Sequence, residues 1–121
     1  MGVLVEVLVT RGCPYEDAAI DLVGAAASAL QVTPRVVLIE VRDLAQARRR
    51  HFVGSPTILV EGRDVSPPVR DTPGLECRSY DTSNGRSGLP DVHAVSLAMA
   101  DAGRSARWPR RIIQRAASSQ T

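Results

Sequence analysis

Apolar and polar positions in the first forty residues predict two strands joined by a helix. Residues 3–9 (VLVEVLV) are almost wholly apolar and rich in β-branched side chains, which is typical of a strand covered on both faces. Pro14 opens a helical pattern that continues to Leu30, and a second buried strand is predicted at residues 35–41 (RVVLIEV). Because a helix joining two buried strands forms a right-handed crossover, we expect the two strands to be parallel.

The pattern changes after residue 42. A short helix is predicted over 43–51, with Asp43 as its N-cap, and residues 57–60 (TILV) predict a strand that turns at 61–63 and returns as an antiparallel hairpin. Residues 66–88 are expected to be a long loop, with 83–88 as a flexible connection. Residues 90–102 return to helical spacing, with these core candidates: Val92, Val95, Leu97, Ala98 and Met99. The predicted class is α/β, in the order β-α-β-α-β-β-α, with a mixed central sheet flanked by helices.

Composition indicates one soluble domain. The 121 residues are 44% apolar and 23% charged, enough to build a core without a disulfide framework or a structural metal. The apolar runs are too short to span a bilayer, and the N-terminus does not resemble a secretion signal, so we expect a cytoplasmic protein. Two cysteines are expected to rest as thiols in that compartment.

Charge divides the chain into a body and a tail. Residues 1–102 hold ten arginines and thirteen acidic residues, a balance of −3, whereas 103–121 hold five arginines and no acid, a balance of +5. We therefore expect a folded domain at 1–102 and a basic C-terminal tail at 103–121. The tail is either a solvated terminus or a segment that meets acidic groups, although nucleic acid is not the expected partner. Trp108 and the Ile112-Ile113 pair favour a short helix at 109–117 docked on the body.

Cys13 is the first candidate for chemistry. It stands where the first strand passes into the first helix, a position where unpaired backbone N–H groups and the helix dipole favour a thiolate. Arg11 adds a positive charge, while Glu16 and Asp17 oppose it. The alternative is structural: Cys13 as the helix N-cap, with Glu16 closing a capping-box-like arrangement.

Four motifs taken together resemble a known family. They are Gly12-Cys13-Pro14, Phe52-Val53-Gly54-Ser55-Pro56-Thr57, Gly62-Arg63-Asp64-Val65 and Cys77-Arg78-Ser79-Tyr80. In this order they resemble the thioredoxin-like superfamily, and most closely small bacterial monothiol members, some of which are labelled alkylmercury lyase-like. The resemblance implies a thioredoxin-like fold in which Pro56 is cis and faces Cys13. It also implies a shallow groove for a thiol or disulfide partner, with these contact residues: Pro14, Tyr15, Ser55, Pro56 and Thr57.

One departure from the family restricts the chemistry. The familiar Cys-x-x-Cys reads Cys13-Pro14-Tyr15-Glu16 here, so a disulfide within the motif is impossible. What remains is chemistry with one thiolate: mixed-disulfide formation, glutathione-linked exchange, or oxidation followed by a distant resolving cysteine. Cys77 is the candidate resolver if residues 75–80 return toward the groove, and its alternative is a buried, inert cysteine.

Three functions stay open at this point. The leading hypothesis is thiol–disulfide or related redox chemistry with Cys13, and Cys77 where it reaches, as catalytic residues. The second is soft-metal or organomercurial handling by the two thiols with a carboxylate such as Asp81. The third is a binding module that keeps the fold without catalysis. His51 and His93 have no local pairing with Cys13, and neither a cofactor nor a resident metal is predicted.

Overall fold

The computed structural model describes residues 2–69 and 72–107. Its elements follow one another in the order β1 (Gly2–Val9), α1 (Glu16–Leu30), β2 (Thr33–Glu40), α2 (Leu44–Arg50), β3 (Thr57–Val60), β4 (Arg63–Asp64), β5 (Tyr80–Thr82), β6 (Gly85–Ser87) and α3 (Val92–Arg107). Helix α3 continues past residue 102 into the first residues of the predicted tail. The helix predicted at 109–117 lies outside the described residues.

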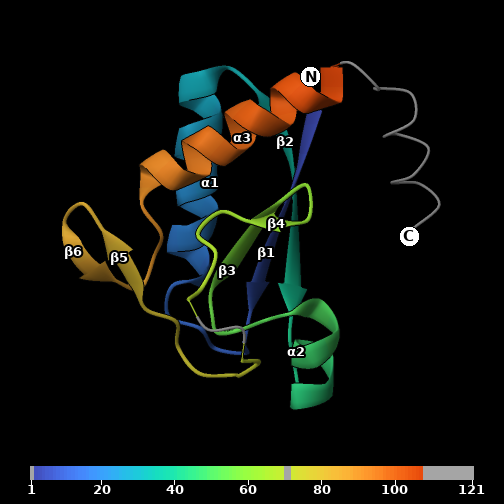
Figure 1. Ribbon diagram of the computed structural model, residues 1–121, viewed down its shortest axis with the longest axis vertical. Helices are drawn as coiled ribbons and strands as arrows, with labels where there is room; N and C mark the ends of the chain where they lie inside the picture. The colour runs from blue at the N-terminus through green and yellow to red at the C-terminus, as the bar shows by residue number, and fades with distance from the viewer. Residues whose placement is uncertain (1, 70–71, 108–121) are drawn as a thin grey trace.

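The first four strands form a mixed sheet in the order β2-β1-β3-β4 (Figure 1). β1 and β2 are parallel along their whole length, from Gly2 opposite Thr33 to Val9 opposite Glu40, which confirms the predicted crossover. β3 runs antiparallel to β1 and pairs with β4 in the predicted hairpin. The chain is therefore an α/β protein with a four-stranded mixed sheet among its described residues.

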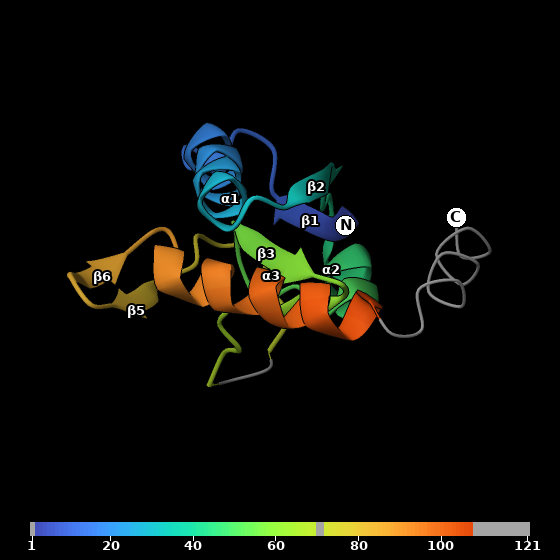
Figure 2. The same ribbon diagram turned by 90° about the horizontal axis from the view of Figure 1, so that it is seen from above.

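The side chains of β1 alternate between the two faces of the sheet and contribute to a core on each face. Val3, Val5, Val7 and Val9 point to the face covered by α1 and α3, which also pack against each other. Leu8 points to the other face, where it packs with Val41, Ala47 and Phe52 around α2. Figure 2 shows α1 and α3 running alongside the sheet. Because β1 is central and covered on both faces, its nearly continuous apolar sequence is explained.

Strand β2 differs from its prediction as a buried strand. It lies at the edge of the sheet, with β1 as its neighbour, and its burial alternates along the strand. Val36 and Leu38 are exposed on its outward side. The apolar run at 35–41 thus forms a strand as predicted, but the expected burial on both faces is wrong, because β2 does not occupy a central position in the sheet.

The start of α2 agrees with its prediction, whereas the buried face of α3 differs from its prediction in part. Asp43 caps α2 as predicted, since its Oδ1 accepts from the Gln46 N–H at 2.8 Å. In α3, Val95 and Met99 are buried and Ala98 packs against the core, but Val92 and Leu97 are exposed, so these two core predictions are wrong. Helical spacing alone does not show which part of a broad apolar stripe reaches the sheet.

The segment predicted as a long loop contains a second small sheet. β5 and β6 form an antiparallel hairpin in which Thr82 pairs with Gly85, so the prediction of a flexible connection at 83–88 is wrong. The Thr82 hydroxyl donates to the Gly85 carbonyl at 2.6 Å and accepts from the Asn84 N–H at 3.2 Å. The hairpin projects beyond the start of α3 in both Figure 1 and Figure 2. Among the described residues, we find no helix with the length and apolar character needed to cross a bilayer.

Candidate functional site

Cys13 lies in a tight loop between β1 and α1. Its N–H donates to the Thr10 carbonyl at 3.2 Å, and its own carbonyl accepts from the Glu16 N–H at 3.3 Å. Cys13 is a free thiol, partly buried, and packs against the core between the sheet and α1 and α3. A partly accessible sulfur held at a strand-to-helix junction suits a nucleophile better than a sulfur sealed in the core.

The helix begins later than the proline pattern predicts. α1 starts at Glu16 rather than Pro14, and Tyr15 occupies the N-cap position without a side-chain hydrogen bond. Cys13 is therefore two residues outside the cap, so the structural alternative of Cys13 as N-cap is wrong. Glu16 and Asp17 fall in the first helical turn, where the helix dipole stabilises their negative charges. They sit beside the thiol and compete with it for the same positive potential.

Thr10 connects the Cys13 loop to the segment before β3. Besides accepting from Cys13, Thr10 donates its N–H to the Ser55 Oγ at 3.0 Å. The Ser55–Pro56 peptide bond is cis, as the resemblance implies. Figure 1 shows that the end of β1 and the start of β3 lie at the same end of the sheet. One residue thus ties the candidate nucleophile to the Ser-Pro-Thr segment.

The five predicted contact residues fall into two groups. Ser55, Pro56 and Thr57 are buried, and the Thr57 hydroxyl donates to the Gly54 carbonyl at 2.7 Å. Pro14 and Tyr15 are exposed. Pro14 and Tyr15, beside Cys13, are thus the side chains available to an incoming partner. Residues 55–57 are covered by the protein. Contact of all five with a substrate remains a prediction.

The Tyr15 ring rests against a backbone segment from a distant part of the sequence. A Cβ atom built on Gly88 would overlap the Tyr15 ring. Gly88 follows β6, where the chain passes from the small hairpin toward α3. The absence of a side chain at Gly88 therefore leaves the space in which this aromatic ring lies beside Cys13. A glycine in a region expected to be loop was the only signal for this role in the sequence.

Cys77 lies on a second stretch of chain that is bridged to the first residue of the cis bond. It is paired with Ser55 in an isolated parallel bridge, in which the Ser55 N–H donates to the Glu76 carbonyl and the Arg78 N–H donates to the Ser55 carbonyl, both at 2.9 Å. Cys77 is an exposed free thiol, so its alternative as a buried apolar residue is wrong. The expected return of residues 75–80 is confirmed as this bridge; a reaction between Cys77 and Cys13 stays a prediction.

The Arg78 side chain ties residues 76–80 to three other parts of the chain. Its guanidinium binds Asp64 at 2.8 Å and Thr57 Oγ1 at 3.1 Å, and it also donates to the Ser66 carbonyl. The side chains of Arg78 and Asp64 are only 7% and 16% exposed, so this ion pair is largely shielded from water. Arg78 belongs to one of the four sequence motifs, but no role was predicted for it. Its only signal in the sequence is its position beside a cysteine in a proline-rich loop.

Tyr80 also links residues 76–80 to the cis-proline segment. Its hydroxyl donates to the Pro56 carbonyl, and the Arg78 guanidinium lies 4.4 Å from the centre of its ring. Burial raises the pKa of the Tyr80 phenol well above its ordinary value, because a phenolate would lose its hydration; the charge on Arg78 partly offsets this effect. Tyr80 is therefore a neutral donor throughout the physiological range.

Gly54 permits the close approach of the two segments. Its φ of +148° lies outside the range that L side chains readily adopt, and a Cβ there would lie 2.9 Å from the Arg78 Cβ and 3.1 Å from the Glu76 carbonyl oxygen. Residues 54–57 and 76–80 are thus packed together by backbone bonds, side-chain bonds and one glycine. We call these two stretches the clamped segment.

Two hollows lie near the thiols. One, of about 670 Å³, opens at the carboxyl ends of β1 and β2 and has this lining: Thr10, Arg11, Glu40, Val41, Arg42 and Leu75. The other, of about 500 Å³, includes Cys77 together with Arg78, Asp81 and Arg86. Both hollows are open, and only the second is lined by a thiol, so a partner that enters it meets Cys77 at a wet surface.

The remaining candidates have other structural roles. Asp81, considered as a third ligand for a soft metal, forms an exposed ion pair with Arg86 at 3.2 Å. His51 ends α2 in a left-handed conformation, and His93 lies in the first turn of α3, where its N–H donates to Asp91. Backbone N–H donors, first that of Ser83, hold the pKa of Asp91 below its ordinary value. Within residues 2–69 and 72–107, no group of three His, Cys, Asp or Glu side chains is arranged to hold a metal.

Comparisons with known proteins leave the site to be interpreted from its own geometry. No protein-family model, curated protein or solved structure matches this chain. The α/β architecture, the tie through Thr10 and the clamped segment are therefore the observations from which function is inferred.

Proposed function

We propose that this chain has a thioredoxin-like fold and that Cys13 acts as the single nucleophile in thiol–disulfide exchange. Support for the fold comes from the element order and from the sheet order β2-β1-β3-β4, with the parallel β1–β2 pair and antiparallel β3. Support for the activity comes from one observation above all. The partly accessible Cys13 is bound through Thr10 to Ser55, whose neighbours are held rigidly by Arg78 and Tyr80.

The reaction that fits this arrangement needs one protein sulfur. The Cys13 thiolate attacks one sulfur of a disulfide R–S–S–R′; the Cys13–S–S–R bond forms, the S–S bond breaks, and R′–S⁻ leaves with the electron pair. A thiol of the partner then attacks the R sulfur of the mixed disulfide, which restores Cys13 as a thiolate and leaves R in a new disulfide with that thiol. Glu16 stands where a neighbouring thiol would be needed to resolve the intermediate within the motif. If Cys77 resolves it instead, Cys77 attacks the Cys13 sulfur, a Cys13–Cys77 disulfide forms, R–S⁻ leaves with the electron pair, and the added thiol reduces the new disulfide.

The buried segment has a positioning role in this scheme. Its polar side chains are already bonded within the protein, so it offers a fixed wall beside the sulfur rather than additional reactive groups. Tyr15 and Pro14, both exposed, are the side chains that a disulfide meets on approach. A rigid support behind a small exposed contact surface is an arrangement that keeps a reacting sulfur in line with its target.

Turnover of a small disulfide by the full chain tests this proposal. An aromatic disulfide that releases a coloured thiolate is supplied with excess thiol, and the wild type is compared with Cys13→Ser and Cys77→Ser. We expect catalysis in the wild type, its loss in Cys13→Ser, and most of it retained in Cys77→Ser. Full activity of Cys13→Ser would contradict the proposal. A folded wild type with no turnover would favour the non-catalytic binding module.

Soft-metal handling is a second candidate because both thiols are tied to Ser55. Cys77 pairs with Ser55 directly, and Cys13 reaches it through Thr10. Thiolates are good ligands for soft ions such as Hg²⁺. Titration of the full chain with Hg²⁺ distinguishes a shared site from two separate thiols: a shared site binds one ion with an affinity that falls in either single Ser variant. Identical curves for the wild type and Cys77→Ser would remove Cys77 from the site.

A further inference from the structure

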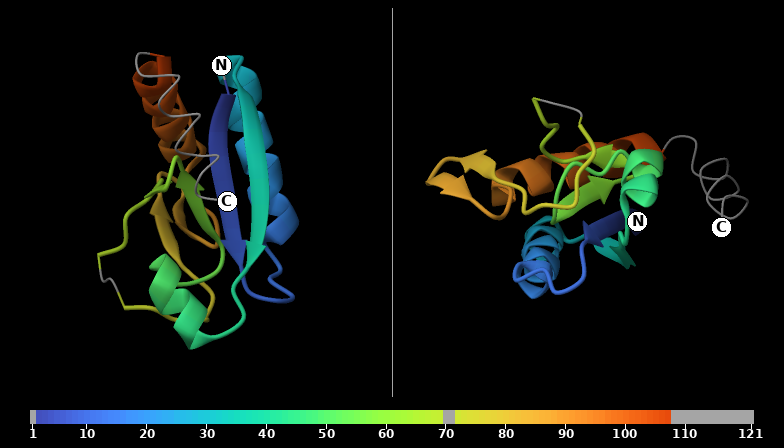
Figure 3. Two further views of the ribbon diagram at one scale, coloured as in Figure 1. Left: turned by 90° about the vertical axis from the view of Figure 1, so that its right-hand side faces the viewer. Right: turned by 90° about the horizontal axis from the view of Figure 1, so that it is seen from below.

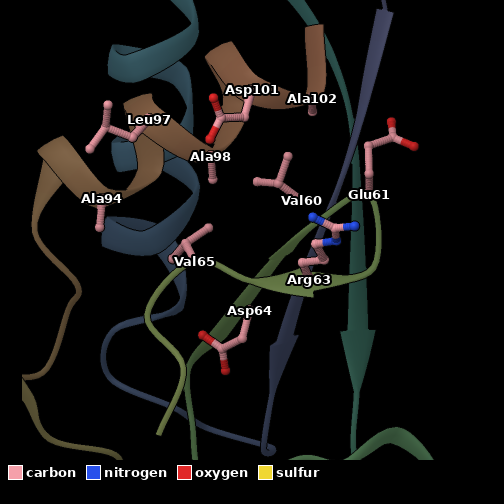
Figure 4. A pocket seen from close by; sticks show the side chains of 10 residues that line it. All are labelled: Val60, Glu61, Arg63, Asp64, Val65, Ala94, Leu97, Ala98, Asp101 and Ala102. Carbon is pink, nitrogen blue, oxygen red and sulfur yellow. The ribbon is translucent and has the colours of Figure 1, made fainter. Parts of the chain in front are cut away.

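A further groove is lined by neither cysteine. It lies between α3 and the β3–β4 hairpin, holds about 490 Å³, and is lined by ten residues. Figure 4 shows α3 contributing Ala94, Leu97 and Ala98 on one side, with Val60 and Val65 opposite them. Leu97 is 65% exposed, which is unusual for a leucine beside a groove in a protein of this size. An apolar floor of this kind is expected to have an occupant.

The rim of the groove is acidic. Glu61, Asp64 and Asp101 line it, against the single basic residue Arg63. Asp64 is paired with Arg78, so its charge is largely neutralised, whereas Glu61 is held in place by the Leu4 N–H and contributes negative potential to the rim. With Arg78 counted beside Arg63, the three acids leave a formal charge of −1. An occupant that matches it has apolar side chains for the floor and cationic side chains for the rim.

The segment that follows α3 has this composition. We propose that residues 108–121 bind back along the groove between α3 and the β3–β4 hairpin. These fourteen residues hold Trp108, Ile112 and Ile113 for the floor, and Arg110, Arg111 and Arg115 for the rim, with no acidic residue. Pro109 disfavours a helical conformation at Trp108, the residue that follows the last residue of α3.

The chain is long enough to do this. The groove follows α3 from Ala94 to Ala102, a helical length of about 12 Å, and Ala102 lies about 8 Å before the end of α3. Fourteen residues reach about 21 Å even as a helix, and farther when extended. The segment therefore spans the distance back to Leu97 in either conformation. A second copy of the chain fits less well, because ten lining residues are fewer than the 20–30 or so that each side of a stable interface usually contributes.

The test uses Trp108, the only tryptophan in the sequence, in the full chain. Collisional quenching by acrylamide is measured for the native protein and for the protein unfolded in guanidinium chloride. We expect Trp108 to be several-fold less accessible in the native protein. In Leu97→Lys, which removes the central apolar anchor and adds repulsion, docking should weaken by about tenfold or more and quenching should rise toward the unfolded value. Circular dichroism verifies that the variant is folded.

Two variants make the comparison specific. Val92→Lys changes another exposed apolar residue of α3 outside the groove and should leave quenching as in the wild type. Ile113→Lys, which changes the segment and leaves the body intact, should raise quenching as Leu97→Lys does. Native quenching equal to that of the unfolded chain, or no response to either Leu97→Lys or Ile113→Lys, would overturn the proposal. Protection that disappears on dilution, with a matching dimer in sedimentation, would assign the groove to a second copy instead.

Discussion

The two cysteines occupy opposite kinds of environment. Cys13 is partly buried in a loop held by a few backbone bonds, and its neighbour Gly12 has open space around it. Cys77 is exposed, yet its backbone belongs to the clamped segment, fixed by Arg78, Tyr80 and Gly54. In Figure 3 the two stretches approach the sheet from different directions. Exposure and a firmly fixed backbone therefore occur together at Cys77, whereas the proposed nucleophile is Cys13, whose sulfur is less exposed and whose loop has fewer long-range contacts.

The largest expected loss of stability comes from Arg78→Met. This change leaves Asp64 without its partner and removes the bonds to Thr57 and Ser66, and breaking a buried ion pair costs about 3–5 kcal/mol. Urea unfolding followed by circular dichroism measures it. Arg86→Met is the matched control, since its pair with Asp81 is 70% and 84% exposed and is worth about 0–1 kcal/mol. Equal, small losses in both variants would show that the clamped segment is not held by Arg78.

Two glycine substitutions compare the regions directly. Gly54→Ala places a Cβ against the backbone of residues 76–78 and should cost about 2–4 kcal/mol, since overpacking adds to an unfavourable φ. Gly12→Ala meets no atom within 4 Å and has only its φ of +73° to overcome, which costs about 1 kcal/mol. The same unfolding measurement tests both. A Gly12 variant as destabilised as the Gly54 variant would contradict the difference in packing.

Tyr80→Phe removes the hydrogen bond to the Pro56 carbonyl and should cost about 1–2 kcal/mol near neutral pH. The folded pKa of Tyr80 is raised, so the native state retains a proton that the unfolded chain releases above its ordinary pKa of 10.0. Wild-type stability should therefore fall by up to about 1.4 kcal/mol per pH unit above pH 10, and this component should be absent in Tyr80→Phe. Parallel stability profiles above pH 10 would contradict the assignment.

Ser55→Ala is expected to change stability only slightly, and it tests the link between the two regions. Loss of the oxygen that accepts from Thr10 should cost about 0.5–1.5 kcal/mol. We also expect slower exchange at Cys13, because its loop loses the tie that positions it, while labelling of Cys77 stays unchanged. Thiol labelling followed by peptide mapping measures the two rates separately. Equal slowing at both cysteines would indicate a general loosening of the fold.

Local sequence patterns predicted the elements well where neighbouring residues decide the outcome. The Asp43 cap, the parallel β1–β2 pair and the β3–β4 turn depend on such short-range chemistry. The edge position of β2 and the exposure of Leu97 do not, because each depends on which distant element is adjacent. The hairpin at residues 80–87 is local, but its strands are only three residues long and carry no alternating apolar pattern that would predict them. A periodic pattern shows that a face is apolar, but tertiary contacts decide whether it is covered.

The same distinction applies to the candidate site. Cys13 and the Ser55–Thr57 motif could be selected from sequence because their residue types are unusual at the start of a helix and of a strand. The roles of Arg78 and Gly88 could not, since one binds Asp64 across fourteen residues and the other faces Tyr15 across most of the domain. Their partners are specified only once the chain has folded.

Competition between the two thiols for a limiting disulfide tests the central proposal most directly. The full chain is mixed with less than one equivalent of a small disulfide, quenched with acid, and analysed by intact mass and peptide mapping. We predict that the mixed disulfide forms first at Cys13 despite its lower exposure, and that unfolding in guanidinium chloride abolishes this preference. Preferential modification of Cys77 in the folded protein, following exposure alone, would contradict the assignment of Cys13 as the nucleophile.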